Sequence, residues 1–205
     1  MTPDYWPQAT TELAAADPML RRLIQQYRHT GLRSRGDPFS TLVRSIVGQQ
    51  ISVKAADSVW RKLAAAVPKI APQPLYEATP ETLQGCGLSR RKIEYLQDLA
   101  RHFLDGALQP ARWGALDDET VIQELTGVRG VGRWTAEMFL IFSLLRPNIL
   151  PLDDIGLQRA MSNHYSAGQP ISKLKIREIA ECWQPWRSVA TWYLWRSLDP
   201  LPVEY

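Results

Sequence analysis

The sequence of 205 residues contains little cysteine, and its two cysteines lie far apart. Cys86 and Cys182 form no C-x-x-C pattern, which argues against a disulfide framework and against a zinc site. No apolar run approaches the length of a membrane span, and the N-terminal residues are neither basic nor apolar enough for a signal peptide. We therefore expect a cytosolic, reduced protein that does not enter a membrane.

Strand signals are almost lacking, whereas helix signals recur along the chain. Capping residues, some followed by proline at the first helical position, predict helix starts. They are Asp17, Asp37, Ser52, Thr79 and Ser89. Apolar residues follow at helical spacing, which predicts one helix that ends near Gly48 and another with Val53, Val59, Trp60 and Leu63 on one side. The sequence therefore predicts an all-α fold.

Other segments complete this outline. Pro68 to Pro74 is proline-rich and predicts a connection. Met138 to Leu145 is apolar nearly all round, so we expect a buried helix there. Ile171 to Trp183 and Pro185 to Ser197 are expected to form the closing helices. A chain of this length forms one domain or two small lobes.

Excess charge of either sign is also lacking. The net charge of +3 permits a nucleic-acid partner but does not require one. The eight tryptophans are many for this length, and they suit either stacking on bases or core packing.

Three glycines within residues 127–132 follow a helical pattern and lead into a second helix that begins near Arg133. Such a turn allows positive φ and close approach, and the amides at the next N-terminus could hold a phosphate. The dinucleotide-binding pattern G-x-G-x-x-G has the reverse spacing and follows a strand. A tight turn between two helices without any ligand is as compatible with these residues as phosphate binding.

Two adjacent carboxylates, Asp153 and Asp154, follow the second helix and Pro147. Either could cap a helix over Ile155 to Met161. Capping and catalysis are compatible, because amides at a helix N-terminus favour the charged carboxylate.

The motifs G-V-G-R-W-T-A-E and L-P-L-D-D resemble the helix-hairpin-helix DNA glycosylases, and within them the alkylation-repair branch of 3-methyladenine DNA glycosylase II. The resemblance runs from about Asp17 to Trp195. It implies a single glycosylase domain over residues 1–205, a helix-hairpin-helix at about 118–145, and a Gly/Pro loop with the catalytic aspartate at about 146–156. The implied fold is all-α with two lobes and a cleft between them.

In this family the spacing from the hairpin tryptophan selects Asp154 as the catalytic residue and leaves Asp153 as a cap or a supporting residue. Bifunctional relatives carry a lysine nucleophile where this chain has Trp134, and no lysine occurs between Lys92 and Lys173. The resemblance therefore implies a glycosylase without lyase activity. Some relatives hold an iron–sulfur cluster on four cysteines, which two cysteines cannot build.

The resemblance also implies roles for residues that contact DNA. Gln50 matches the wedge that fills the space of a flipped base, although a helix C-terminal turn explains it equally well. Trp134, Met138 and Trp195 match the base pocket, with methionine where relatives can have tyrosine; each tryptophan alone is more often a core residue. Cationic alkylated purines are attracted by such aromatic faces.

The hairpin is expected to hold the DNA backbone. The amides of Gly130 and Gly132 would bind a phosphate, and in relatives the carbonyls matching Thr126, Val128 and Val131 hold a structural monovalent cation, Na⁺ or K⁺. Arg90, Arg91 and Lys92 form a second candidate backbone contact or a solvated helix face.

We therefore expect a monofunctional DNA glycosylase that excises alkylated purines such as 3-methyladenine and 7-methylguanine from double-stranded DNA, with no catalytic cofactor. The alternative is a non-catalytic module of the same fold that binds damaged DNA. An enzyme with a nucleotide cofactor is disfavoured by the glycine spacing. We expect a monomer, associated with the nucleoid in a bacterium or nuclear in a eukaryote.

Overall fold

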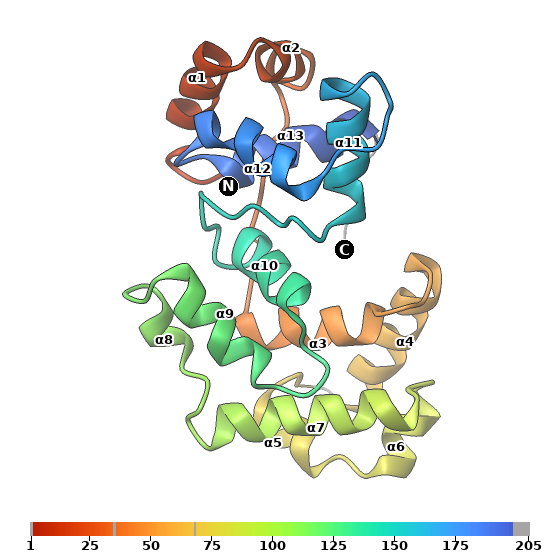
Figure 1. Ribbon diagram of the computed structural model, residues 1–205. Helices are drawn as coiled ribbons and strands as arrows, with labels where there is room; N and C mark the ends of the chain where they lie inside the picture. Colours follow the sequence, from red (N-terminus) through yellow and green to blue (C-terminus); the bar gives the residue numbers. More distant parts are fainter. Residues whose placement is uncertain (1, 35, 68, 199–205) are drawn as a thin grey trace. The chain divides into compact units, whose positions relative to one another are not determined.

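The structure, a computed structural model, describes residues 2–34, 36–67 and 69–198 (Figure 1). Every regular element in these ranges is helical, which confirms the predicted all-α class. The chain divides into two compact units, and their described parts are residues 2–34 with 140–198 and residues 36–67 with 69–139. No helix in these ranges is long and apolar enough to cross a membrane.

The first unit is built around its last helix. Its elements are α1 (Trp6–Ala16), α2 (Pro18–Gln26), α11 (Ile155–Tyr165), α12 (Lys173–Ile179), the 3-10 helix η1 (Ala180–Trp183) and α13 (Arg187–Leu198). All residues from 188 to 194 of α13 are buried, and α1, α2 and α11 pack against it (Figure 1). Trp6 of α1 meets Trp192 edge to face, with ring centroids 5.3 Å apart. A helix covered on all sides in this way forms the core of its unit.

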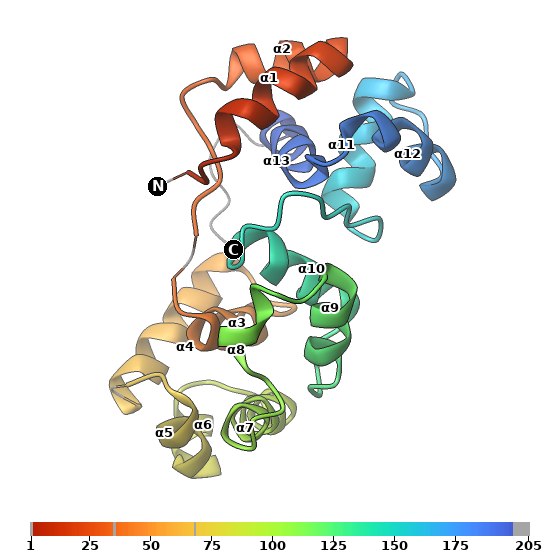
Figure 2. The same cartoon turned by 90° about the vertical axis from the view of Figure 1, so that its left-hand side faces the viewer.

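The second unit is built around a long central helix. Its elements are α3 (Pro38–Gly48), α4 (Val53–Ala66), α5 (Pro72–Glu77), α6 (Pro80–Gly85), α7 (Arg90–Leu104), α8 (Pro110–Trp113) and α9 (Asp118–Thr126). Helix α7 packs against α3, α5 and α6, and Figure 2 shows α5 and α6 beside it. Helix α10 (Arg133–Phe142) begins in this unit and ends in the first.

The predicted helix starts are confirmed. The five predicted capping side chains each accept a hydrogen bond from a backbone N–H in the first turn of the helix that follows. Each such cap contributes about 1 kcal/mol to helix stability. The predicted end of a helix near Gly48 is confirmed as well, because α3 ends at that residue.

Some predicted bounds are wrong. Of the expected connection from Pro68 to Pro74, Pro68 lies outside the described residues, and the rest ends early because α5 begins at Pro72, where a proline is pre-organised for the first helical turn. The expected buried helix over Met138 to Leu145 stops at Phe142. Beyond Phe142 the chain turns back, because Leu145 has a φ of +54° and the Arg146 amide bonds the Leu140 carbonyl at 2.9 Å.

The face predicted for α4 is only partly covered. Leu63 is fully buried, whereas Val53 is 55% exposed. Helical spacing tells which residues share a side of a helix, but it does not tell whether another element covers that side. The two closing helices also begin later than predicted, at Lys173 and Arg187.

Candidate active site and DNA-contacting turns

Asp154 is the N-cap of α11 in the first unit. Its Oδ1 accepts the Leu157 amide at 2.6 Å and the Trp195 Nε1–H at 2.7 Å. The side chain is half-buried. The N-terminus of a helix favours a negative charge, so the cap and the indole together hold this carboxylate in one orientation where its charge is stabilised.

Trp195 of α13 supplies an aromatic face beside that carboxylate. Its ring stacks on Phe142, with centroids 5.6 Å apart and planes 16° apart. A Cβ at Gly156 would lie 3.0 Å from Asp154 Oδ1 and 3.1 Å from Trp195 Cδ1, so a larger residue would force this pair to shift. Sequence reasoning missed Phe142 and Gly156. A glycine in the first turn of a helix, two residues after Asp154, was the available signal for the second.

The loop before α11 is fixed to the core of the first unit by a buried serine. The Ser188 amide donates to the Pro147 carbonyl, and its Oγ accepts the Ile149 amide, both at 2.9 Å. Ser188 is fully buried in α13. Further along, the Gln158 side chain donates to the Leu152 carbonyl at 2.8 Å. The segment that leads to the aspartate pair is therefore held at several points.

The second aspartate has a different environment. Asp153 forms an ion pair with Lys173, the first residue of α12, and both side chains are 57% exposed. Exposed pairs of this kind contribute little to stability because water screens them. Asp154 is therefore the helix cap, and Asp153 is not.

The hairpin of the helix-hairpin-helix, residues 127–132, lies in the second unit and joins α9 to α10. Gly130 has a φ of +83°, and a Cβ there would meet the Tyr95 ring at 2.1 Å. Gly132 caps α10, because its carbonyl accepts the Ala136 amide at 3.0 Å. Within the described ranges, the amides of Gly130 and Gly132 donate to no protein acceptor.

The turn that carries Gln50 contacts this hairpin. Gln49 Nε2 donates to the Gly130 carbonyl at 2.9 Å, across 81 residues of sequence. Gln50 itself has a φ of +58°, a left-handed conformation that costs a non-glycine residue about 1 kcal/mol. Retained strain of this kind is frequent at functional sites. The hydrogen bond from Gln49 to the hairpin was not predicted from the sequence.

Helix α7 holds both turns. Lys92 Nζ donates to the Val47 carbonyl at 2.6 Å, and burial lowers the pKa of this lysine. Lys92 is thus held by a hydrogen bond within the protein, and it is not part of a solvated helix face. Asp98 accepts the Arg129 amide at 2.8 Å. Burial disfavours the charge of Asp98, but hydrogen bonds from Arg129 and Arg101 outweigh it, and the pKa of Asp98 is lowered.

Trp134 and Met138, predicted to line a base pocket, lie one turn apart on α10 and so share a face of that helix. Trp134 is 41% exposed, and Met138 is half-buried. Partial exposure leaves an aromatic surface accessible. The pocket role of both residues stays a prediction.

The residues predicted to hold a monovalent cation have suitable chemistry. The carbonyl groups of Thr126, Val128 and Val131 are neutral oxygen donors, the kind that hard cations prefer. The Val128 carbonyl accepts the Val131 amide at 3.1 Å and keeps a second lone pair. In the described part of the chain, no group of three or more His, Cys, Asp or Glu side chains could hold a metal ion.

A family comparison adds to this geometry. The sequence profile described as "HhH-GPD superfamily base excision DNA repair protein" matches residues 43–186, which is more than half of the chain. The chain belongs to this superfamily. The matched residues include the glycine hairpin, the aspartate cap and α10.

Individual relatives agree with this assignment. DNA-3-methyladenine glycosylase 1 of Schizosaccharomyces pombe is 29% identical over 198 residues, which cover 93% of this chain and 86% of the relative. The crystal structure of a DNA-3-methyladenine glycosidase from Bacillus halodurans is 35% identical, covers 96% of this chain and 92% of that chain, and has a TM-score of 0.87. The S. pombe 3-methyladenine DNA glycosylase in complex with abasic DNA is 28% identical, covers 93% and 96%, and has a TM-score of 0.80. The protein is a DNA glycosylase of base excision repair.

Proposed function

We propose that this glycosylase removes alkylated purines of the 3-methyladenine and 7-methylguanine type from double-stranded DNA by hydrolysing the N-glycosidic bond. The observation that carries the proposal is the half-buried Asp154 carboxylate, held by the Leu157 amide and the Trp195 indole. The names of the relatives support the substrate class.

The chemistry follows from the charge of Asp154. Breaking the glycosidic bond gives the sugar oxocarbenium character, and a carboxylate beside it stabilises the developing positive charge. Two unit charges 4 Å apart at an effective dielectric of 20 interact by about 4 kcal/mol, on the order of a thousandfold in rate. The same carboxylate can orient or deprotonate the attacking water.

The remaining site residues have supporting roles in this proposal. Trp134, Met138 and Trp195 would line the pocket for the cationic base, and Gln50 would fill the space that the base leaves. The free amides of Gly130 and Gly132 would grip a backbone phosphate, which positions the protein without reading sequence.

A structural monovalent cation on the carbonyls of residues 126, 128 and 131 would complete the phosphate grip. We also propose that the protein works as a monomer without a catalytic cofactor. We propose that it is cytoplasmic and associated with the nucleoid in a bacterium, or nuclear in a eukaryote.

The proposed enzyme has no lyase activity. A lyase needs an amine that attacks the sugar to form a Schiff base. The hairpin position that carries such a lysine in bifunctional relatives is Trp134 here, and no lysine occurs between Lys92 and Lys173.

The test is base release from methylated duplex DNA, with chromatography of the freed bases and alkali added only afterwards to reveal strand breaks. We expect 3-methyladenine or 7-methylguanine to appear, and strands to break only after alkali. Asp154→Asn, which keeps a cap acceptor but loses the charge, should lower the rate on the order of a thousandfold while DNA binding persists.

Asp153→Asn is the matched control, because it neutralises the neighbouring, exposed carboxylate. We expect a far smaller loss of rate from it. An Asp154→Asn variant with full activity would overturn the mechanism. Tight DNA binding by the unmodified protein without any base release would favour the alternative, a binding module for damaged DNA.

A further inference from the structure

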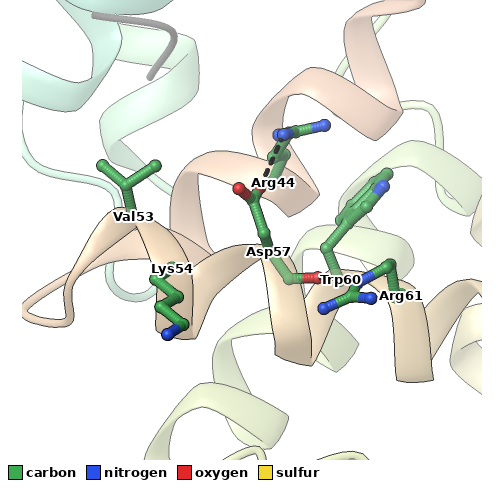
Figure 3. Close-up of a pocket in the computed structure, with 6 residues that line it drawn as sticks. All are labelled: Arg44, Val53, Lys54, Asp57, Trp60 and Arg61. Carbon is green, nitrogen blue, oxygen red and sulfur yellow. Dashed lines mark hydrogen bonds and ion pairs between the residues drawn. The ribbon is translucent and has the colours of Figure 1, made fainter.

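The second unit has a pocket that no residue of the glycine hairpin lines. It is an open cavity of about 740 Å³ on α3 and α4, shown in Figure 3. The residues that line it are Arg44, Val53, Lys54, Asp57, Trp60 and Arg61. Three of these six side chains are cationic and one is anionic, so the pocket carries a net positive charge. The roles proposed above use none of them.

Arg44 is held in place at the edge of this pocket. Its Nη2 pairs with Asp57 Oδ1 at 3.0 Å, and its guanidinium lies 5.4 Å from the centroid of the Trp60 ring. The side chains of Arg44 and Asp57 are 45% and 49% exposed. Water screens an exposed pair of this kind, so the guanidinium can exchange its carboxylate partner for another anion.

Two further cations project from α4. Lys54 and Arg61 are seven residues apart, so they lie on one face of the helix and about 10 Å apart along its axis. Both are exposed. The ammonium of Lys54 has no partner among the residues that the structure describes. Val53, at 55% exposure, adds an apolar surface next to these charges.

We propose that these cations, with Val53 and Trp60, form a surface that binds the backbone of duplex DNA; we call it the α4 surface. Phosphates would meet Arg44, Lys54 and Arg61, and the apolar faces of the deoxyriboses would meet Val53 and Trp60. This inference rests on the proposed function, since the DNA is the glycosylase's substrate.

Two observations favour DNA over another occupant. The alternation of charge and apolar surface matches a nucleic-acid backbone, in which anionic phosphates alternate with sugars. The α4 surface also begins at Val53, three residues after Gln50 in the same unit. A duplex that reaches the turn of Gln50 therefore comes within reach of the first turns of α4.

The experiment measures the affinity of the whole chain for a short duplex with an abasic-site analogue over a series of salt concentrations. Each lost phosphate contact lowers the magnitude of the slope of log K against log salt by about 0.9. If the variant and the unmodified protein bind equally at about 1 M salt, the variant then binds about eightfold more weakly than the unmodified protein at about 0.1 M salt. We expect this change from Lys54→Gln and from Arg61→Gln. Asp57→Asn removes a negative charge from the surface, so it should tighten binding, a gain that misfolding cannot produce.

Lys62→Gln is the matched control. Lys62 is an exposed cation of the same helix that does not line the pocket, so its loss should leave the slope unchanged. Unchanged slopes for Lys54→Gln and Arg61→Gln, weaker binding by Asp57→Asn, or an equal loss from Lys62→Gln would overturn the proposal.

The two proposals fail in different ways. If the unmodified protein releases methylated bases but the variants keep the original slope, the α4 surface is wrong and the proposed function stands. If the slopes change as expected but no base is released, the surface stands and the catalytic proposal is wrong.

Discussion

At the scale of single residues, the indole of Trp195 has two separable contacts. Its ring stacks on Phe142, and its N–H donates to Asp154 across 41 residues of sequence. Hydrogen bonds to charged groups contribute about 1.5–3 kcal/mol. The N–H therefore orients the carboxylate, while the ring face offers a surface for a flat ligand.

A Trp195→Phe substitution separates these contacts, because phenylalanine keeps an aromatic ring but has no N–H. We expect the single-turnover rate of base release to fall about tenfold to a hundredfold, the equivalent of one charge-assisted hydrogen bond. Phe142→Leu is the comparison, since it removes the stacking partner and retains the indole N–H. An unchanged rate in Trp195→Phe would show that the indole does not orient Asp154.

At the scale of elements, α7 sets the place of two turns that are distant in sequence. Lys92 bonds the last turn of α3, Tyr95 packs under Gly130, and Asp98 bonds the Arg129 amide. Because Gln49 also bonds the Gly130 carbonyl, the turn of residues 48–52 and the hairpin form one bonded assembly in the second unit. A substitution that displaces the hairpin should therefore also displace the turn that carries Gln50.

Alanine substitutions of the two hairpin glycines, Gly130 and Gly132, should differ in their effect on the free energy of unfolding. Gly130→Ala places a Cβ 2.1 Å from the Tyr95 ring at a φ of +83°, so it should lower the free energy of unfolding by about 2–4 kcal/mol. Gly132→Ala meets nothing within 4 Å and should leave stability nearly unchanged. The proposed close approach of a phosphate predicts that Gly132→Ala still weakens DNA binding.

Urea unfolding and DNA titration of both variants check this pair of expectations. Gly130→Ala combined with Tyr95→Ala should recover part of the lost stability, because the smaller side chain removes the overlap. Equal stability of the two single variants would contradict the described packing of Tyr95. Normal DNA binding by Gly132→Ala would contradict the phosphate grip.

At the scale of the whole molecule, the first unit contains the buried tyrosine Tyr193 and the half-buried tyrosines Tyr5 and Tyr165. Burial raises the pKa of Tyr5 to about 12 and also raises those of Tyr165 and Tyr193. The Tyr5 hydroxyl donates to the Leu145 carbonyl, and the Tyr165 hydroxyl donates to Asp17, both at 2.7 Å. Ionisation would break both bonds.

These shifts predict a loss of stability at alkaline pH. A group whose pKa is raised in the folded state contributes stability that is complete below the pKa of the unfolded chain, near 10, and is lost as the pH rises through the folded value. The urea midpoint should therefore fall between about pH 10 and 12. Tyr5→Phe should flatten this dependence, whereas Tyr76→Phe, at a 47% exposed position of the second unit, should not. The prediction would be contradicted if the urea midpoint depended equally on pH in the unmodified protein, in Tyr5→Phe and in Tyr76→Phe.

Local physics made much of the fold predictable. Caps such as Asp37 and Ser52 act within three residues, so the sequence alone placed most helix starts, the glycine turn and the aspartate pair. The bounds of α5 and α10 were less accurate, because a proline-rich segment and an apolar segment each allow more than one conformation. The lack of lysine between residues 92 and 173 was likewise available from the sequence.

The sequence by itself determined the helical class, the capping pattern and the motifs that mark the family, because these depend on neighbours within a turn or two. Only the tertiary structure decided which residues meet: Trp195 with Asp154, Gln49 with Gly130, and Arg44 with Asp57. It also decided that Val53 stays exposed. Such contacts join residues from different helices, so they follow from how the helices pack, which helical spacing and propensity do not specify.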